Sequence, residues 1–252
     1  MENEQEPKIN LTVLDFIAAR VDEVFANHLA LVNQLGVRVA THLIINQEHA
    51  EDGPGRTICT LLLNAMSSLR ASLELMRRGF PLQVGILVRN ALEVMALAAV
   101  INSDGQAYEK YKQGKLDSSS CIGLVKKAWP EMGMVIARTW GQLSDSFTHV
   151  GSLYQRWQNV SPVPTYQELF ALGTVLLAIK GALHTLDLLS ELTCYRYVDQ
   201  PRFWKHLEAN KYTYDPTPEG KAWMEKFFMD PCKDIPVIES TESSTPPDVK
   251  TP

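Results

Sequence analysis

Two long apolar segments constrain this chain more than any other feature, at residues 80–101 and 169–192. Each is close to the length of a helix that crosses a bilayer. The first holds Arg89 and Glu93 near its centre. The second holds Lys180, His184 and Asp187. Because each charged residue costs roughly 2.5–3.5 kcal/mol at mid-membrane, we predict buried helices of a bundle and no membrane span.

The pattern along the rest of the chain predicts an all-α fold, a helical bundle with a few short peripheral helices. Apolar residues recur at steps of three and four over residues 11–34, which is typical of an amphipathic helix. Gly36 either breaks this run or only loosens it. Further helices are predicted at 37–49, 56–78, 82–101, 121–147 and 165–196, with smaller ones at 201–210 and 218–229. Thr165 and Glu168 resemble a capping box at the start of the longest helix.

The domain organisation follows from composition. The chain has 252 residues, of which 45% are hydrophobic, enough for a sizeable core. It shows no internal repeat, no convincing strand pattern and no interior linker, which favours a single helical domain over residues 11–229. Residues 1–10 are polar and predict a flexible N-terminus without a signal peptide. Residues 230–252 are rich in Pro, Ser, Thr and acidic residues, which predicts a disordered tail.

The net charge indicates which partners the surface suits, and the cysteines indicate the cellular compartment. A formal net charge of -5 argues against a surface devoted to nucleic acid, although a local basic patch is compatible with it. Basic pairs at 77–78 and 126–127, near Trp129 and Trp140, form either an RNA-stacking surface or ordinary solvated charges beside core aromatics. The 4 cysteines lie far apart with no CxxC pair, which indicates free thiols in a reducing compartment. We therefore expect a cytoplasmic protein.

Arg89 and Glu93 are the strongest candidate site residues. Their spacing of four places both on one helical face within an apolar run. Charged groups in such surroundings are costly unless they are paired. The pair is therefore either a structural ion pair or a pair kept for binding and chemistry.

Arg70 and Glu74 repeat this spacing in the preceding predicted helix and are candidate ligand-binding residues. If the two helices pack antiparallel through a turn at Gly79, all four charges face one cleft. The alternative is a solvent-exposed pair, which the more polar surroundings of Arg70 and Glu74 favour.

A polar helix end supplies the remaining candidates, Ser144, Asp145 and His149. A histidine there can transfer protons near neutral pH, with Ser144 and Asp145 available for ligand binding. The alternative is a helix-terminal histidine that only bonds free carbonyl groups.

Several familiar motifs are absent from the sequence. It has no HExxH element and no pair of Glu-x-x-His elements, so zinc-peptidase and di-iron chemistry lack their ligands. A P-loop, a dinucleotide-binding glycine motif and a Gly-x-Ser-x-Gly elbow are likewise missing. We therefore predict no metal and no cofactor.

Three short segments carry a family resemblance. Residues 73–80 (LELMRRGF) lead into 87–93 (LVRNALE), and a later helix ends with 143–149 (LSDSFTH). This arrangement resembles helical bacterial proteins grouped with the HEPN superfamily, over about residues 58–151. The resemblance implies an all-α bundle, frequent homodimerisation and a setting in toxin–antitoxin, phage-defence or stress systems, in which catalytic members cleave RNA.

The resemblance also implies roles for single residues. Arg89 would contact a phosphate of RNA or a nucleotide, Glu93 would orient Arg89, and His149 would act as acid or base. No histidine follows Arg89 at the spacing that active HEPN ribonucleases use, so whether the chain is an enzyme stays open. Two alternatives remain, namely a non-enzymatic module that binds a partner protein and a small-ligand sensor that uses its cleft as a pocket.

Overall fold

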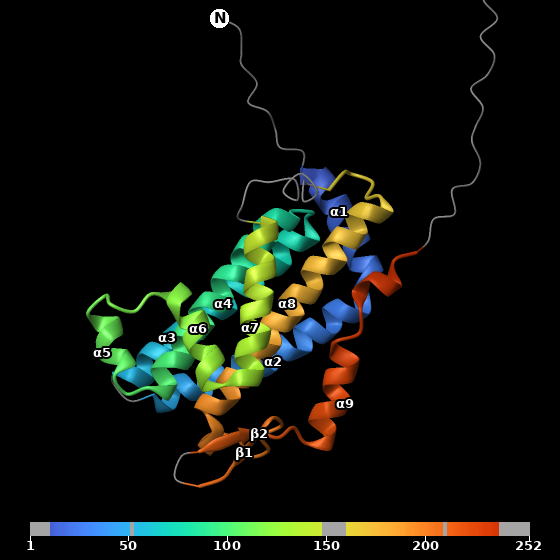
Figure 1. Cartoon of the computed structure of the whole chain (residues 1–252). Coiled ribbons are helices and arrows are strands. Elements are labelled where there is room, and N and C mark those ends of the chain that lie inside the picture. Colours follow the sequence, from blue (N-terminus) through green and yellow to red (C-terminus); the bar gives the residue numbers. More distant parts are fainter. Residues whose placement is uncertain (1–10, 51–52, 148–159, 209–210, 237–252) are drawn as a thin grey trace, which may run out of the picture.

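The computed structural model describes residues 11–50, 53–147, 160–208 and 211–236, and its fold is mostly helical (Figure 1). The helices are α1 (Leu11–Val24), α2 (Ala26–His49), α3 (Pro54–Arg77), α4 (Pro81–Ser103), α5 (Ala107–Lys112), α6 (Ser118–Ala128), α7 (Pro130–Phe147), α8 (Tyr166–Thr193) and α9 (Pro218–Phe227). The 3-10 turns η2 (Tyr195–Tyr197) and η3 (Pro231–Asp234) and a hairpin of β1 (Trp204–His206) and β2 (Tyr212–Tyr214) complete it. The prediction of an all-α bundle is confirmed.

Helices α4 and α8 form the centre of the bundle. Helix α8 packs against α2, α3 and α4, and α4 also packs against α6 and α7 (Figure 1). Both are long and apolar enough to cross a membrane by length and composition, and 67% of each apolar window is buried inside the protein. An apolar surface on nearly every side is what a central helix of a bundle requires.

Local sequence explains where several helices begin. Thr165 accepts a hydrogen bond from the backbone N–H of Glu168, whose carboxylate accepts from the backbone N–H of Thr165, so the predicted capping box at α8 is confirmed. Asp117 caps α6 and Thr217 caps α9 in the same way with single bonds. These caps satisfy N–H groups that have no partner within the helix.

The corner between α3 and α4 requires glycine. Gly79 has a φ of +79°, a conformation that residues with a Cβ adopt only at a cost. A Cβ on Gly79 would lie 2.8 Å from Cβ of Val160, and the Gly79 carbonyl accepts the N–H of Val160 at 3.0 Å. The corner therefore turns α3 back along α4 and also anchors the chain just before α8.

The structure corrects three expectations. The helix predicted over residues 11–34 is interrupted at Phe25, whose buried ring packs in the core, while Gly36, for which both a break and a loosening were open, lies inside α2. The helix predicted at 201–210 is wrong, because this segment supplies strand β1, in which Trp204 pairs with Tyr214 of β2. Disorder from residue 230 onward is also wrong for η3, which packs on α8 and buries Pro231.

The cysteines agree with the expectation of free thiols. Cys59, Cys121 and Cys194 are buried and Cys232 is partly buried, and all four are free. Burial raises the pKa of Cys121 to about 11 and that of Cys194 to about 12, so these thiols are protonated at neutral pH. They behave as small core residues.

The geometry of the α3–α4 corner predicts the effect of adding a methyl group. Gly79→Ala should lower the free energy of unfolding by about 1–3 kcal/mol, because it combines a positive φ with a close contact. Gly123→Ala in α6 is the matched control, since a Cβ there meets nothing within 4 Å. That change should raise stability by about 0.5–1 kcal/mol in urea unfolding. Equal effects of the two variants would contradict the prediction.

Candidate functional site

The predicted pair Arg89 and Glu93 forms an ion pair on α4, with 3.1 Å between Nη2 of Arg89 and Oε1 of Glu93. The Arg89 guanidinium carbon lies 5.1 Å from the ring centre of Trp140 on α7, a cation–π arrangement. Trp140 donates its Nε1–H to Oε1 of Glu93 at 2.8 Å, and Ser118 of α6 donates its hydroxyl to Oε2 at 3.3 Å. The cluster therefore joins α4 to α6 and α7.

The surroundings of this cluster favour its structural interpretation. The side chains of Arg89 and Glu93 are 28% and 15% exposed. Both carboxylate oxygens of Glu93 accept hydrogen bonds from neighbouring helices. Nε of Arg89 is the exception, since it is buried without a hydrogen-bond partner among the described residues. A role for the cluster in binding RNA or a nucleotide stays a prediction.

Arg70 and Glu74 do not share a cleft with Arg89 and Glu93. Glu74 pairs with Arg77 at 3.3 Å. Arg70 and Glu74 line a cavity of about 670 Å³ that is walled by α2, α3 and α8. The Arg89 cluster contacts α6 and α7 instead, so antiparallel packing of α3 and α4 leaves the two pairs on different faces.

The remaining candidates are Ser144 and Asp145, both on α7, and His149. Ser144 is buried and donates its hydroxyl to the Trp140 carbonyl at 2.8 Å, whereas Asp145 is exposed. His149 lies outside the described residues. Convergence of Arg89, Glu93 and His149 on one site therefore stays a prediction.

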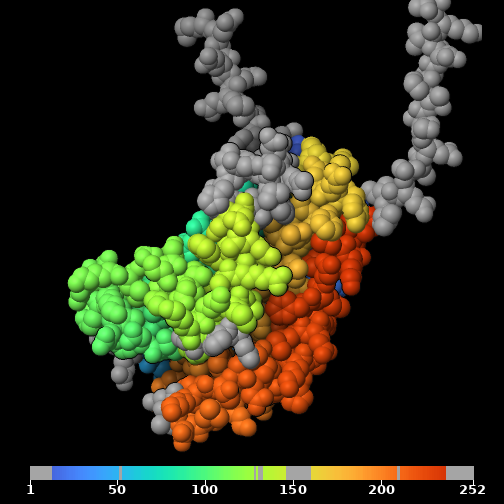
Figure 2. Space-filling model, viewed as in Figure 1, coloured from blue at the N-terminus to red at the C-terminus, as the bar shows by residue number. Residues whose placement is uncertain are grey.

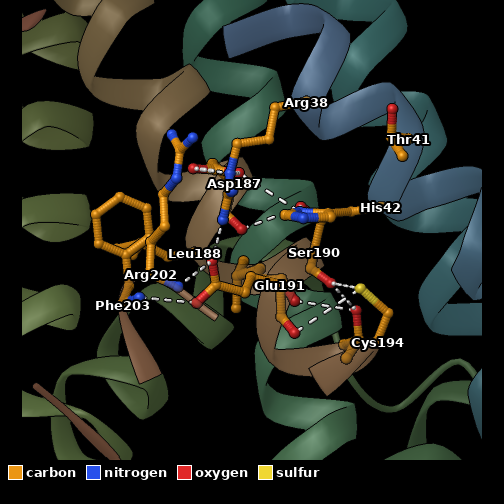
Figure 3. A network of polar contacts seen from close by, with 12 residues as sticks. Arg38, Thr41, His42, Asp187, Leu188, Ser190, Glu191, Cys194, Arg202 and Phe203 are labelled. Carbon is orange, nitrogen blue, oxygen red and sulfur yellow. Dashed lines mark hydrogen bonds and ion pairs between the residues drawn. The ribbon is translucent and has the colours of Figure 1, made fainter. Parts of the chain in front are cut away.

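A second charge cluster, deep in the bundle, escaped the sequence analysis. Arg38 projects from α2 toward two carboxylates of α8, Asp187 and Glu191, which are both fully buried (Figure 3). Its Nε lies 3.1 Å from Oδ1 of Asp187, and its Nη2 donates to Glu191. Nδ1 of His42 lies 3.5 Å from the same Asp187 oxygen and 3.3 Å from the Ser190 hydroxyl. The network fixes α2 against α8.

Glu191 also holds the hairpin. Its carboxylate accepts backbone N–H groups from Arg202 at 3.0 Å and Phe203 at 2.8 Å (Figure 3). It also accepts the backbone N–H of Trp204 at 3.3 Å. The Trp204 indole donates its Nε1–H to the carbonyl of Leu188 at 2.8 Å. One buried carboxylate thus satisfies three N–H groups and sets the position of Trp204 on α8.

Burial shifts the pKa values of Asp187 and His42 in this network. It raises the pKa of Asp187 to about 7, although Arg38 favours the ionised form. It lowers the pKa of His42 to about 4, and the positive charge of Arg38 acts in the same direction. His42 is therefore neutral at physiological pH.

A third buried group anchors the C-terminal segment. Nζ of Lys180, on α8, lies 3.0 Å from Nδ1 of His28 and donates to the Met229 carbonyl at 3.0 Å. Nε2 of His28 in turn lies 3.0 Å from Oδ2 of Asp234. Burial lowers the pKa of Lys180 to about 8. These contacts hold η3 and the end of α9 against α8, next to Phe228.

On the face seen in Figure 2, α7 lies beside the segment that forms the hairpin and α9. Residues of α7, α8 and the hairpin, together with Trp129 and Phe228, line a cavity of about 460 Å³, which we call the aromatic pocket. Its lining is mostly apolar and includes Trp129, Leu188, Trp204, Tyr212, Tyr214 and Phe228. On the α8 side the lining residues include Gly181, where an added Cβ would meet nothing within 4 Å. The pocket has the size and character of a small-molecule site.

His184 is a histidine in the lining of this pocket. It is 8% exposed, and the rings of Phe203 and Phe228 lie edge-on to it at 5.0 and 5.3 Å. Its Nδ1 is buried and has no hydrogen-bond partner among the described residues. Burial lowers the pKa of His184 to about 4. At neutral pH the ring is uncharged and offers one donor and one acceptor nitrogen.

The spacing on α8 is the signal that points to these residues. After Glu168 in its first turn, the charged and histidine residues of α8 recur at intervals of four, three and four, which places them on one helical face. They are Lys180, His184, Asp187 and Glu191. A row of this kind inside an apolar helix requires partners from other elements, and the sequence does not show which elements supply them.

The part of the chain that the structure describes contains no group of histidine, cysteine, aspartate and glutamate side chains that could hold a metal ion. Comparison with protein families, with curated proteins and with solved structures finds no match for this chain. The resemblance to HEPN proteins therefore stays a prediction, and the site has to be judged from its own geometry.

Removal of the Glu191 carboxylate should strongly destabilise the protein. Glu191→Ala removes the acceptor of Nη2 of Arg38 and of three backbone N–H groups, which should cost about 3–5 kcal/mol. Glu23 is the control, because its side chain is 70% exposed and pairs with Arg20 in the same helix. Glu23→Ala should change stability by less than about 1 kcal/mol in urea unfolding. A small effect of Glu191→Ala would contradict the assigned role.

The neutral form of His184 in the folded protein should make the free energy of unfolding depend on pH. Its pKa falls from 6.5 in the unfolded chain to about 4 in the folded protein. The stability that this group contributes is therefore present above pH 6.5 and is lost as the pH falls toward 4. Relative to His184→Phe, the wild type should lose about 1–2 kcal/mol between about pH 7 and pH 5 in urea unfolding. Asp187 changes the stability with pH in the opposite direction, and comparison with the variant cancels this change because both proteins contain Asp187. A difference in stability between wild type and variant that does not change with pH would contradict a neutral His184.

Proposed function

We propose that this protein binds a small, planar and largely apolar molecule in the aromatic pocket. The observation that supports this proposal is the placement of His184, a neutral imidazole without a hydrogen-bond partner at Nδ1, in a cavity lined by aromatic rings. Buried polar groups are normally satisfied, so an unsatisfied one beside a cavity is typical of a binding site.

The size and the chemistry of the pocket agree with this proposal. A volume of about 460 Å³ lies within the range of pockets that hold small ligands. Trp129, Trp204 and Tyr212 offer flat faces on which a planar ring can stack. His184 adds one directional contact to an otherwise apolar surface. Such a site suits the recognition of a small ligand. This agrees with the small-ligand sensor, which is one of the three functions that the sequence leaves open.

The other two readings depend on features outside this pocket. Action on RNA or a nucleotide in a defence system rests on Arg89, Glu93 and His149, and a protein-interaction module rests on an exposed groove. Both remain predictions. The aromatic pocket is favoured because its size, its aromatic lining and an unsatisfied polar atom coincide at one place.

The proposal can be tested by filling the pocket from one side. Gly181→Leu adds a side chain toward open space on α8. The probe is 2-naphthaleneacetamide, a neutral bicyclic compound, and binding is followed through the indole N–H signals in NMR spectra. The signals of Trp129 and Trp204 should shift, while that of Trp140 in the Arg89 cluster should not. Gly181→Leu should weaken binding by at least about tenfold, which corresponds to about 1.4 kcal/mol.

A matched variant shows whether the loss is specific. Gly123→Leu makes the same change in α6, where a Cβ also meets nothing within 4 Å. It should leave binding unchanged. If planar compounds shift neither tryptophan signal, or if both leucine variants bind equally well, the proposed function is wrong.

A further inference from the structure

The imidazole of His184 is enclosed, and a ligand cannot reach its buried Nδ1 while every element stays in place. The rings of Phe203, Trp223 and Phe228 flank it at centroid distances of 5.0, 6.1 and 5.3 Å. Phe203 is fully buried, and its backbone N–H is held by α8. Trp223 and Phe228 both belong to residues 218–235, and Phe228 is 38% exposed. A contact between a ligand and Nδ1 therefore requires this segment to move.

Residues 218–235, which we call the strap, are fixed at their start. The backbone N–H of Thr217 donates to the carbonyl of Arg202, beside the hairpin, at 2.8 Å. Helix α9 then runs along the edge of the bundle (Figure 1), and of its 10 residues only Gly220 and Phe227 are buried. An element with so few buried side chains detaches at a lower free energy than the helices of the core.

The far end of the strap is held by a latch of hydrogen bonds. Nζ of Lys180 donates to the Met229 carbonyl and lies 3.0 Å from Nδ1 of His28, whose Nε2 lies 3.0 Å from Oδ2 of Asp234. Among the described residues, no carboxylate lies within ion-pair distance of this Nζ. Because opening moves Met229 and Phe227 away from Lys180, it returns water to the ammonium and offsets part of the contacts that are lost.

Resting on the proposed function, we infer that the strap is the gate of the aromatic pocket and opens to admit the planar ligand. Opening breaks the latch and turns the strap about its fixed start at Thr217. This movement takes Phe228 away from the pocket and uncovers Nδ1 of His184. The ring system of the ligand then occupies the place of Phe228 against the imidazole. Because the closed state excludes the ligand, the apparent affinity scales with the fraction of open protein.

A disulfide provides a way to hold the strap closed. Gly173 of α8 faces the strap, and a Cβ there would lie 2.9 Å from Sγ of Cys232, within reach of a disulfide. Oxidised Gly173→Cys should bind 2-naphthaleneacetamide at least about tenfold more weakly than the same protein after reduction with dithiothreitol. Binding is followed through the indole N–H signals of Trp129 and Trp204. Comparison of two redox states of one variant separates the cross-link from the substitution.

A weaker latch should have the opposite effect. Asp234→Ala removes the carboxylate that holds His28, and it should tighten binding of the same probe about threefold, because more of the protein is open. Alkylation of Cys232 by iodoacetamide at constant pH should accelerate by a similar factor, since this partly buried thiol lies on the strap. Glu225→Ala is the control, because it removes an exposed carboxylate of α9. It should change neither binding nor alkylation.

The alkylation rate needs no ligand, and it therefore separates this inference from the proposed function. If oxidised and reduced Gly173→Cys bind the probe equally well, or if Asp234→Ala changes neither binding nor alkylation, the strap is not a gate and the pocket stands. If alkylation accelerates in Asp234→Ala but no planar compound binds to this variant or to the wild type, the proposed function itself fails, and the role of the strap as its gate fails with it.

Discussion

The structure depends on a row of four ionisable side chains on one face of α8, Lys180, His184, Asp187 and Glu191. A buried charge is tolerated only where a partner and hydrogen bonds compensate for the loss of water. Asp187 and Glu191 meet Arg38 of α2, and Glu191 also binds the backbone of the hairpin. Lys180 binds the carbonyl at the end of α9. One face of a single helix therefore sets the positions of the N-terminal and C-terminal parts of the chain.

The aromatic pocket is a consequence of this arrangement. Glu191 places Trp204 at one end of the row on α8, and Lys180 holds the segment that carries Phe228 at the other end. Between them the row continues with His184, which differs from its neighbours because its Nδ1 has no hydrogen-bond partner in the part of the chain that the structure describes. The same interactions that stabilise the fold thus leave a neutral imidazole beside an apolar cavity, and this is the basis of the proposed binding function.

Two pairs of ionisable residues show why equal spacing does not imply an equal role. Arg89 and Glu93 are four residues apart on α4, and Asp187 and Glu191 have the same spacing on α8. The first pair is opposite in charge and compensates itself, so it lies half-buried at the junction of three helices. The second pair is like-charged, and it requires a cation and N–H donors from distant parts of the chain. The self-compensating pair is the more prominent in the sequence, because each charge and its partner lie in one helix.

Local features of the sequence determined the helical fold. Apolar periodicity, the capping box at Thr165 and the glycine at the α3–α4 corner are short-range signals, and they place α3, α4 and α8 correctly. The hairpin was missed because its position depends on Glu191, a residue outside the segment, which binds the backbone of a sequence that looked helical. The candidate site was missed for a similar reason. The sequence by itself placed ionisable residues inside the apolar helix α8. Only the tertiary structure decided their partners, because Arg38 lies about 150 residues away from Asp187 and Glu191 along the chain. Contacts over such separations follow from the packing of whole elements and not from the pattern within one of them.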